Sequence, residues 1–274
     1  MTPSAAPRLR DVIPLKDFNP TRRRAWATLG LIVACVLVYF WVQPPASGAM
    51  LDLSANRFTY SKAAIPEELT SGEPLTVSKV FEGNPAAAAS CEGITATREG
   101  PGIRLTGDQN KPCFPEKNVY LAVLTSLFLH GSVAHLAFNM LFLWIFGNNL
   151  EDRWGRLRYL LFYVGAGIVA TLAFVLTSPG GAVPLIGASG AIAGVMGAYL
   201  VLFPRARILG LLVIIPLPLP AWAFLGFWFL SQFAGGSDGV AYAAHVGGFL
   251  FGMAVGALVR ALSPRPPQYV PAFR

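Results

Sequence analysis

The sequence has few charged residues. Asp, Glu, Lys and Arg make up 13% of its 274 residues, whereas a soluble domain has about a quarter. Hydrophobic residues make up 54%. Five long stretches contain no charged residue at all, namely 25–51, 118–150, 159–204, 208–237 and 239–259. This scarcity excludes an ordinary soluble globular protein, and the composition indicates a polytopic membrane protein.

Histidine is also scarce. The chain has only three histidines, His130, His135 and His245, and all of them lie in or beside uncharged stretches. An ionisable side chain at membrane depth is costly, so each is a candidate functional residue. The alternative for any one of them is a hydrogen-bonded structural histidine. Because the polar segments contain none, the group as a whole points to function.

The uncharged stretches have the length of membrane-spanning helices. A bilayer core requires about 20 apolar residues per helix, and the stretch 159–204 has room for two helices. The sequence predicts six spans, near 26–43, 120–148, 157–177, 188–203, 220–236 and 241–261. The predicted fold class is therefore all-α, a polytopic six-helix membrane bundle. Prolines exclude a helix across 216–220, and the apolar stretch 208–215 is too short to span, so we expect it at the membrane interface.

Basic residues are distributed asymmetrically along the chain. Fourteen of the 21 Lys and Arg lie in the first tail or after the second, fourth or sixth span. The positive-inside rule then places both termini in the cytoplasm of a multi-pass protein of the cell (inner) membrane. We expect cytoplasmic tails at 1–24 and 263–274 and a membrane domain at 25–262. The net charge of +7 follows from this distribution, so the lipid bilayer, and not nucleic acid, is the expected partner.

A long polar loop, 44–118, separates the first two spans and is expected on the exported side of the membrane. We expect it to contain little apolar material for a core of its own. Two of the three cysteines, Cys91 and Cys113, lie in this loop, where oxidising conditions permit a disulfide. The sequence leaves open whether they pair. The third, Cys35, lies in the first span and is expected to be inert packing.

Four polar side chains are predicted to lie at one depth in the outer leaflet. The second, fourth and sixth spans all run inward, and His135, Asn139, Ser189 and His245 lie near their outer ends. His135 and Asn139 are four residues apart, so they share a helix face. Ser189 begins its helix, where backbone N–H groups lack a partner within the helix and favour an anion. This convergence indicates a catalytic site that faces the exterior.

Glycines recur every four residues in the fourth and sixth spans, at Gly190, Gly194, Gly248, Gly252 and Gly256. Small residues at this spacing let two membrane helices approach closely. Such packing would bring Ser189 beside His245. Without His245, helix packing alone would be the preferred interpretation of the segment from Gly187 to Gly190.

Three segments resemble the signature stretches of the rhomboid intramembrane serine proteases. They are His130-Gly-Ser-Val-Ala-His135-Leu-Ala-Phe-Asn139-Met140, Gly187-Ala188-Ser189-Gly190-Ala-Ile-Ala-Gly194 and Ala244-His245-Val-Gly-Gly248-Phe-Leu-Phe-Gly252. The segment from Ile13 to Pro20 also resembles bacterial members. Two departures concern the loop 44–118, which looks unusually long and lacks the Trp-Arg pair that bacterial members often have there.

The resemblance implies a serine endopeptidase with a Ser–His dyad, needing no metal and no cofactor. Ser189 would be the nucleophile and His245 the base, and the predicted spans contain no Asp or Glu that could complete a triad. Asn139, His135 and the Ser189 N–H would stabilise the oxyanion. The substrate-binding positions would be Gly187, Ala188, Gly190 and His130. Substrates would be proteins with a transmembrane helix, admitted beside the fifth span with its aromatic residues Trp222, Phe227, Trp228 and Phe229.

Three alternatives remain at this point. A catalytically inactive rhomboid-like scaffold would bind membrane proteins without cutting them. A metal-dependent enzyme would use the three histidines, although the pair four residues apart is His–Asn and no acidic residue accompanies it. A transporter would have polar residues at mid-membrane and internal repeats, and neither is seen. The oligomeric state is left open.

Overall fold

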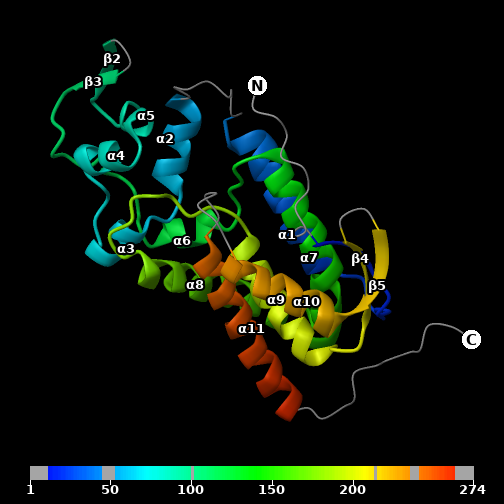
Figure 1. Ribbon diagram of the computed structural model, residues 1–274. Coiled ribbons are helices and arrows are strands. Elements are labelled where there is room, and N and C mark those ends of the chain that lie inside the picture. Colours follow the sequence, from blue (N-terminus) through cyan, green and yellow to red (C-terminus); the bar gives the residue numbers. More distant parts are fainter. Residues whose placement is uncertain (1–11, 45–52, 100–101, 213–214, 235–240, 263–274) are drawn as a thin grey trace, which may run out of the picture. The chain divides into compact units, whose positions relative to one another are not determined.

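The computed structural model describes residues 12–44, 53–99, 102–212, 215–234 and 241–262 (Figure 1). The predicted tail 263–274 and the first part of the tail 1–24 lie outside these ranges. Contacts divide the chain into two compact units. The first unit comprises residues 1–32, 137–170 and 189–274, and the second comprises 33–136 and 171–188.

Each predicted span contains a helix. The helices are α1 (Trp26–Leu37, continued by a π-helical turn Val38–Val42), α7 (Val133–Trp154), α8 (Arg156–Thr177), α9 (Ser189–Leu202), α10 (Ala221–Ser231) and α11 (Tyr242–Leu262). Within the described ranges, three of them, α7, α8 and α11, are long and apolar enough to cross a membrane. The other three are shorter apolar helices. Gly155 separates α7 from α8 in a left-handed conformation, with φ of 78°, that disfavours other residues.

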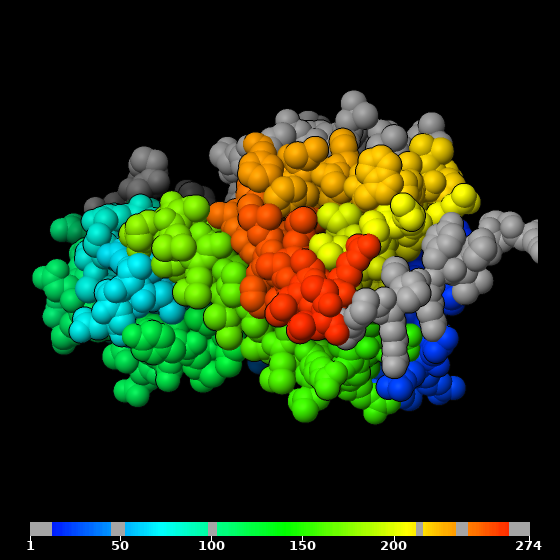
Figure 2. Space-filling model, turned by 90° about the horizontal axis from the view of Figure 1, so that it is seen from below, coloured from blue at the N-terminus to red at the C-terminus, as the bar shows by residue number. Residues whose placement is uncertain are grey.

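The first unit is built around α9, which is buried along most of its length. Helix α11 packs against α9 through glycines, as the four-residue spacing predicted. A Cβ at Gly252 would overlap the carbonyl oxygen of Gly194, and one at Gly256 would lie 3.1 Å from the Cα of Ala198. Figure 2 shows the red end of α11 uncovered on one face. The side chains of Leu258 and Leu262 in this helix are exposed.

The prediction of an all-α fold is wrong in one respect, because the first unit also contains a sheet. Strands β1 (Val12–Asp17), β4 (Arg207–Leu212) and β5 (Ile215–Pro220) form an antiparallel sheet in the order β1-β4-β5. Of the stretch 208–215, expected at the membrane interface, residues 208–212 lie in β4 and Ile215 begins β5. The prolines of 216–220, where no helix was expected, alternate along the edge strand β5. Their missing N–H donors lie on the outward side, so they break no pairing with β4.

The long loop is also folded, contrary to our expectation. It contains α2 (Leu53–Lys62), α3 (Pro66–Ser71), α4 (Val77–Gly83), α5 (Pro85–Ala88) and the hairpin β2 (Thr95–Glu99) and β3 (Gly102–Thr106), followed by α6 (Leu121–Ser126). Its buried cluster consists of Tyr60, Ile65, Leu75, Val77, Val80, Ala87, Ala88, Cys91, Cys113 and Phe114. These ten side chains are scattered along the loop and several are small, so no apolar run reveals them in the sequence.

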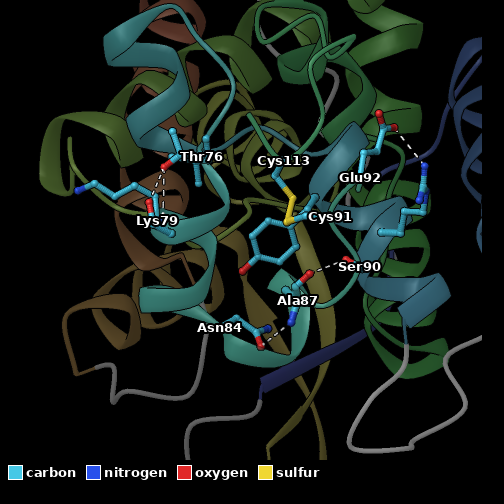
Figure 3. Close-up of a disulfide and its surroundings, with 12 residues drawn as sticks. Thr76, Lys79, Asn84, Ala87, Ser90, Cys91, Glu92 and Cys113 are labelled. Atoms are coloured by element: carbon cyan, nitrogen blue, oxygen red, sulfur yellow. Dashed lines mark hydrogen bonds and ion pairs between the residues drawn. A yellow bond between two sulfur atoms is a disulfide. The ribbon is translucent and has the colours of Figure 1, made fainter. Parts of the chain in front are cut away.

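A disulfide joins Cys91 to Cys113 at the centre of this cluster (Figure 3). Figure 3 also shows the caps of the neighbouring helices. The side chain of Thr76 accepts from the Lys79 N–H at the start of α4, and that of Asn84 accepts from the Ala87 N–H at the start of α5. The disulfide therefore links the end of the capped helix pair to the segment that returns toward α6.

Besides the disulfide, a buried ion pair joins distant parts of this region. The Nζ of Lys117 lies 2.5 Å from Oε2 of Glu68, and the two side chains are 1% and 3% exposed. Lys117 also donates to the carbonyl of Tyr60, and Glu68 accepts from the N–H of Leu75. Burial raises the pKa of Glu68 and lowers that of Lys117, and their mutual attraction opposes both shifts.

Candidate functional site

Ser189 and His245 meet in the first unit. The Oγ of Ser189, the first residue of α9, lies 2.8 Å from Nε2 of His245 in the first turn of α11. Both residues are half-buried, so the pair is not sealed inside the protein. A serine hydroxyl and an imidazole at this distance can exchange a proton, which is the geometry of an activated nucleophile.

Glycine packing places the two side chains. A Cβ at Gly248, one turn after His245, would overlap the carbonyl oxygen of Gly190. A Cβ at Gly190 would lie 2.6 Å from the Cβ of Ala170 on α8, too close for a real contact. The close approach of α9 to α11 therefore depends on the absence of a side chain at Gly248, and that of α9 to α8 on its absence at Gly190. The approach to α11 brings the hydroxyl within hydrogen-bonding reach of the ring.

The second ring nitrogen of His245 has a partner that our sequence analysis missed. Its Nδ1 lies 2.8 Å from Oε1 of Gln232, which follows α10 in a 3-10 turn (Gln232–Ala234). The signal in the sequence was a lone amide side chain in an otherwise apolar stretch. Of the aromatic residues in the fifth span, Trp228 lies against the ring of His245, with 5.9 Å between ring centroids, whereas Trp222 and Phe227 are exposed.

Asn139 provides an unused donor in the first unit. Its side chain is only 7% exposed, and its Nδ2 has no hydrogen-bond partner among the residues that the structure describes. A buried amide donor without a partner is uncommon and requires an explanation. An anionic group bound beside α7 would supply the missing acceptor.

The remaining predicted residues lie in the second unit. The His130 and His135 rings make an edge contact with centroids 5.2 Å apart, and His135 accepts a long hydrogen bond from Gly131 N–H. His130 is buried, and the side-chain amide of Gln43 holds its backbone N–H and carbonyl. These contacts hold the backbone of His130 in place.

Two small residues precede the serine. Gly187 has φ of 116° and donates its N–H to the carbonyl of Ser126, while Ala188 is fully buried. The positive φ explains why glycine occupies the turn before α9. The third small residue of the motif, Gly190, lies in the buried first turn of α9.

Helix α7 extends beyond the predicted span and carries two carboxylates in its last turn. Glu151 accepts from the N–H groups of Ala27 and Thr28 in the first turn of α1. Asp152 accepts from those of Arg22 and Arg23, just before this helix. Both carboxylates therefore bind backbone donors. Glu151 is 16 positions beyond His135 on the same helix, or about 24 Å along its axis, so it is remote from the first turn of α7. In the part of the chain that the structure describes, no group of three or more His, Cys, Asp or Glu could hold a metal ion.

Comparisons with known proteins agree on one family. The pattern of the Rhomboid domain matches residues 117–262. Mitochondrial Rhomboid protein 1 of Saccharomyces cerevisiae is 36% identical over 148 residues, which are 50% of this chain and 41% of the relative. Rhomboid protease GluP of Bacillus subtilis is 47% identical over 78 residues, 28% of this chain and 15% of the relative. The human mitochondrial presenilin-associated rhomboid-like protein is 33% identical over 149 residues, 48% and 36% of the two chains. The matched segments thus span less than half of the length of these relatives.

Proposed function

Because the chain belongs to the rhomboid family, we propose that it is an intramembrane serine endopeptidase in which Ser189 is the nucleophile and His245 the general base. The observation that carries this proposal is the 2.8 Å contact between Ser189 Oγ and His245 Nε2. One relative carries the name of a rhomboid protease, which supports the same activity.

The proposed reaction proceeds in two steps. Ser189 Oγ attacks the carbonyl carbon of a substrate peptide bond while His245 Nε2 takes the hydroxyl proton. When the tetrahedral intermediate collapses, the C–N bond breaks, and His245 delivers the proton to the leaving amine. Water then attacks the acyl-enzyme with His245 again as base, which releases the acid product and restores the serine.

Two donors are proposed to stabilise the oxyanion. The Ser189 N–H is at the helix N-terminus, where donors are unpaired within the helix and the dipole favours negative charge. The Nδ2 of Asn139, which has no partner among the described residues, is the second proposed donor. We assign His135 to the same task, and Gly187, Ala188, Gly190 and His130 to the substrate-binding surface, on the signature motifs alone.

We propose substrates with a transmembrane helix and a chain that crosses the membrane six times. Both termini are then cytoplasmic, the folded segment 44–118 is exported, and the site opens toward the exterior. The cell membrane is the proposed location, although five of the matched relatives are mitochondrial. A helix hides its scissile amides in its own hydrogen bonds, so cleavage should favour segments that unwind easily, with Gly or Pro near small residues.

A fluorophosphonate probe tests the proposal, since it reacts with activated serines. The wild-type protein should be labelled, and Ser189→Ala should not. An unlabelled wild-type protein that still binds a single-span membrane protein would instead support the inactive rhomboid-like scaffold.

A further inference from the structure

We propose that Gln232 is a positioning residue that fixes which ring nitrogen of His245 carries the proton. This inference rests on the proposed function, in which His245 is the base. The imidazole is held at both ends, with Ser189 Oγ 2.8 Å from Nε2 and Gln232 Oε1 2.8 Å from Nδ1. The catalytic Ser–His pair therefore has an uncharged third partner, Gln232.

The contacts of the Gln232 amide nitrogen determine which group donates and which accepts in these hydrogen bonds. Its Nε2 lies 3.0 Å from the backbone carbonyl oxygen of Trp228 and 3.1 Å from Oγ of Ser231. A carbonyl can only accept, so the amide nitrogen has to face Trp228, and the amide oxygen has to face His245. Because that oxygen cannot donate, Nδ1 must carry the proton.

This arrangement selects the productive tautomer. With the proton on Nδ1, Nε2 has the lone pair that accepts the hydroxyl proton of Ser189. When that proton arrives, the ring becomes an imidazolium, and its Nδ1–H bond to Gln232 strengthens because the donor is now charged. Gln232 itself gains and loses no proton. In serine proteases with a triad, a carboxylate orients the histidine in the same way and also adds a full charge.

Aromatic packing holds the amide in place. The ring of Trp228 lies against both His245 and Phe249, with centroids 5.9 Å and 5.7 Å away, and Phe229 stacks on Phe249 at 4.7 Å. The end of α10 is thus fixed to α11 over the turn that carries His245. Any movement of this end away from α11 would separate Gln232 from Nδ1, so the position of α10 sets the tautomer.

The experiment compares Gln232→Met, which keeps the shape but removes the acceptor, with Gln232→Glu, which keeps an acceptor oxygen. Nitrogen-15 NMR of histidine-labelled full-length protein in detergent reports the tautomer, because the chain has only three histidines. The His245 signal is assigned by its loss in His245→Asn. Gln43→Met is the matched control, since that amide binds only the backbone of His130.

We expect a single Nδ1-protonated tautomer in the wild type and in Gln43→Met, and a mixture in Gln232→Met. Cleavage of a transmembrane substrate by Gln232→Met should show kcat reduced about tenfold, the equivalent of one net hydrogen bond, with KM unchanged. Gln232→Glu should restore the tautomer and part of kcat.

An unchanged His245 tautomer in Gln232→Met would overturn the inference, and so would a changed tautomer with wild-type kcat. Failure of the proposed function is a different result. In that case the wild-type protein neither reacts with a fluorophosphonate nor cleaves any substrate, whatever the NMR spectra show.

Discussion

Gly248→Ala adds one methyl group where α11 crosses α9. The new Cβ would overlap the carbonyl oxygen of Gly190 and lie 3.4 Å from the Cβ of Ala170. Carbon and oxygen atoms need about 3.3 Å between them, so the two helices have to separate by roughly 1 Å. Overpacking of this kind lowers the free energy of unfolding by about 1–3 kcal/mol.

The same separation acts on the catalytic pair. The distance of 2.8 Å between Ser189 Oγ and His245 Nε2 would grow beyond hydrogen-bonding range. A misplacement of about 1 Å in a reacting group can reduce the rate roughly 100-fold. We therefore expect Gly248→Ala to fold, to melt at a lower temperature than wild type, and to react with a fluorophosphonate roughly 100-fold more slowly.

The assay compares labelling rate constants and melting temperatures in one detergent. Gly226→Ala on α10 is the matched control, because a Cβ there meets nothing within 4 Å. It should label at the wild-type rate and gain about 0.5–1 kcal/mol of stability, as alanine does over glycine in a helix. Wild-type labelling by Gly248→Ala would refute the claim that glycine packing positions the dyad.

Three further predictions concern other residues. Cys91→Ser should lower the stability of the folded loop by roughly 3 kcal/mol without changing the labelling rate, and without reductant neither Cys91 nor Cys113 should react with a thiol reagent. Lys117→Met should cost about 3–5 kcal/mol by leaving Glu68 buried without its partner. Because burial raises the pKa of Glu68, the folded variant binds a proton more readily than the unfolded chain, so thermal melts should show its stability rising as the pH falls through that raised pKa. Asn139→Ala should slow cleavage by the equivalent of about 3 kcal/mol or less while the protein stays folded, because Nδ2 has no hydrogen bond to lose in the described structure.

The helices and the central pair could be predicted from sequence because both leave regular signals. Uncharged stretches of membrane length mark the helices, and the four-residue glycine spacing predicts which two pack together. Since side chains at Gly248 and Gly252 would clash with the backbone of α9, that spacing carries geometric information. It predicts that Ser189 lies beside His245.

The features that the sequence did not reveal depend on contacts between distant segments. Strand β1 pairs with β4 across almost 200 positions, and no local pattern distinguishes the β4–β5 hairpin from an interfacial segment. The core of the loop is assembled from isolated side chains such as Tyr60 and Phe114. Gln232 becomes meaningful only when α10 packs against α11.

Cleavage of a single-span membrane protein in reconstituted vesicles tests the central claim most directly. Wild-type protein should cut it within its transmembrane helix, and Ser189→Ala and His245→Ala should each cut less than about a thousandth as fast, because nucleophile and base act as a unit. Cleavage by either folded variant above that level would contradict the assignment of Ser189 and His245 as the catalytic pair.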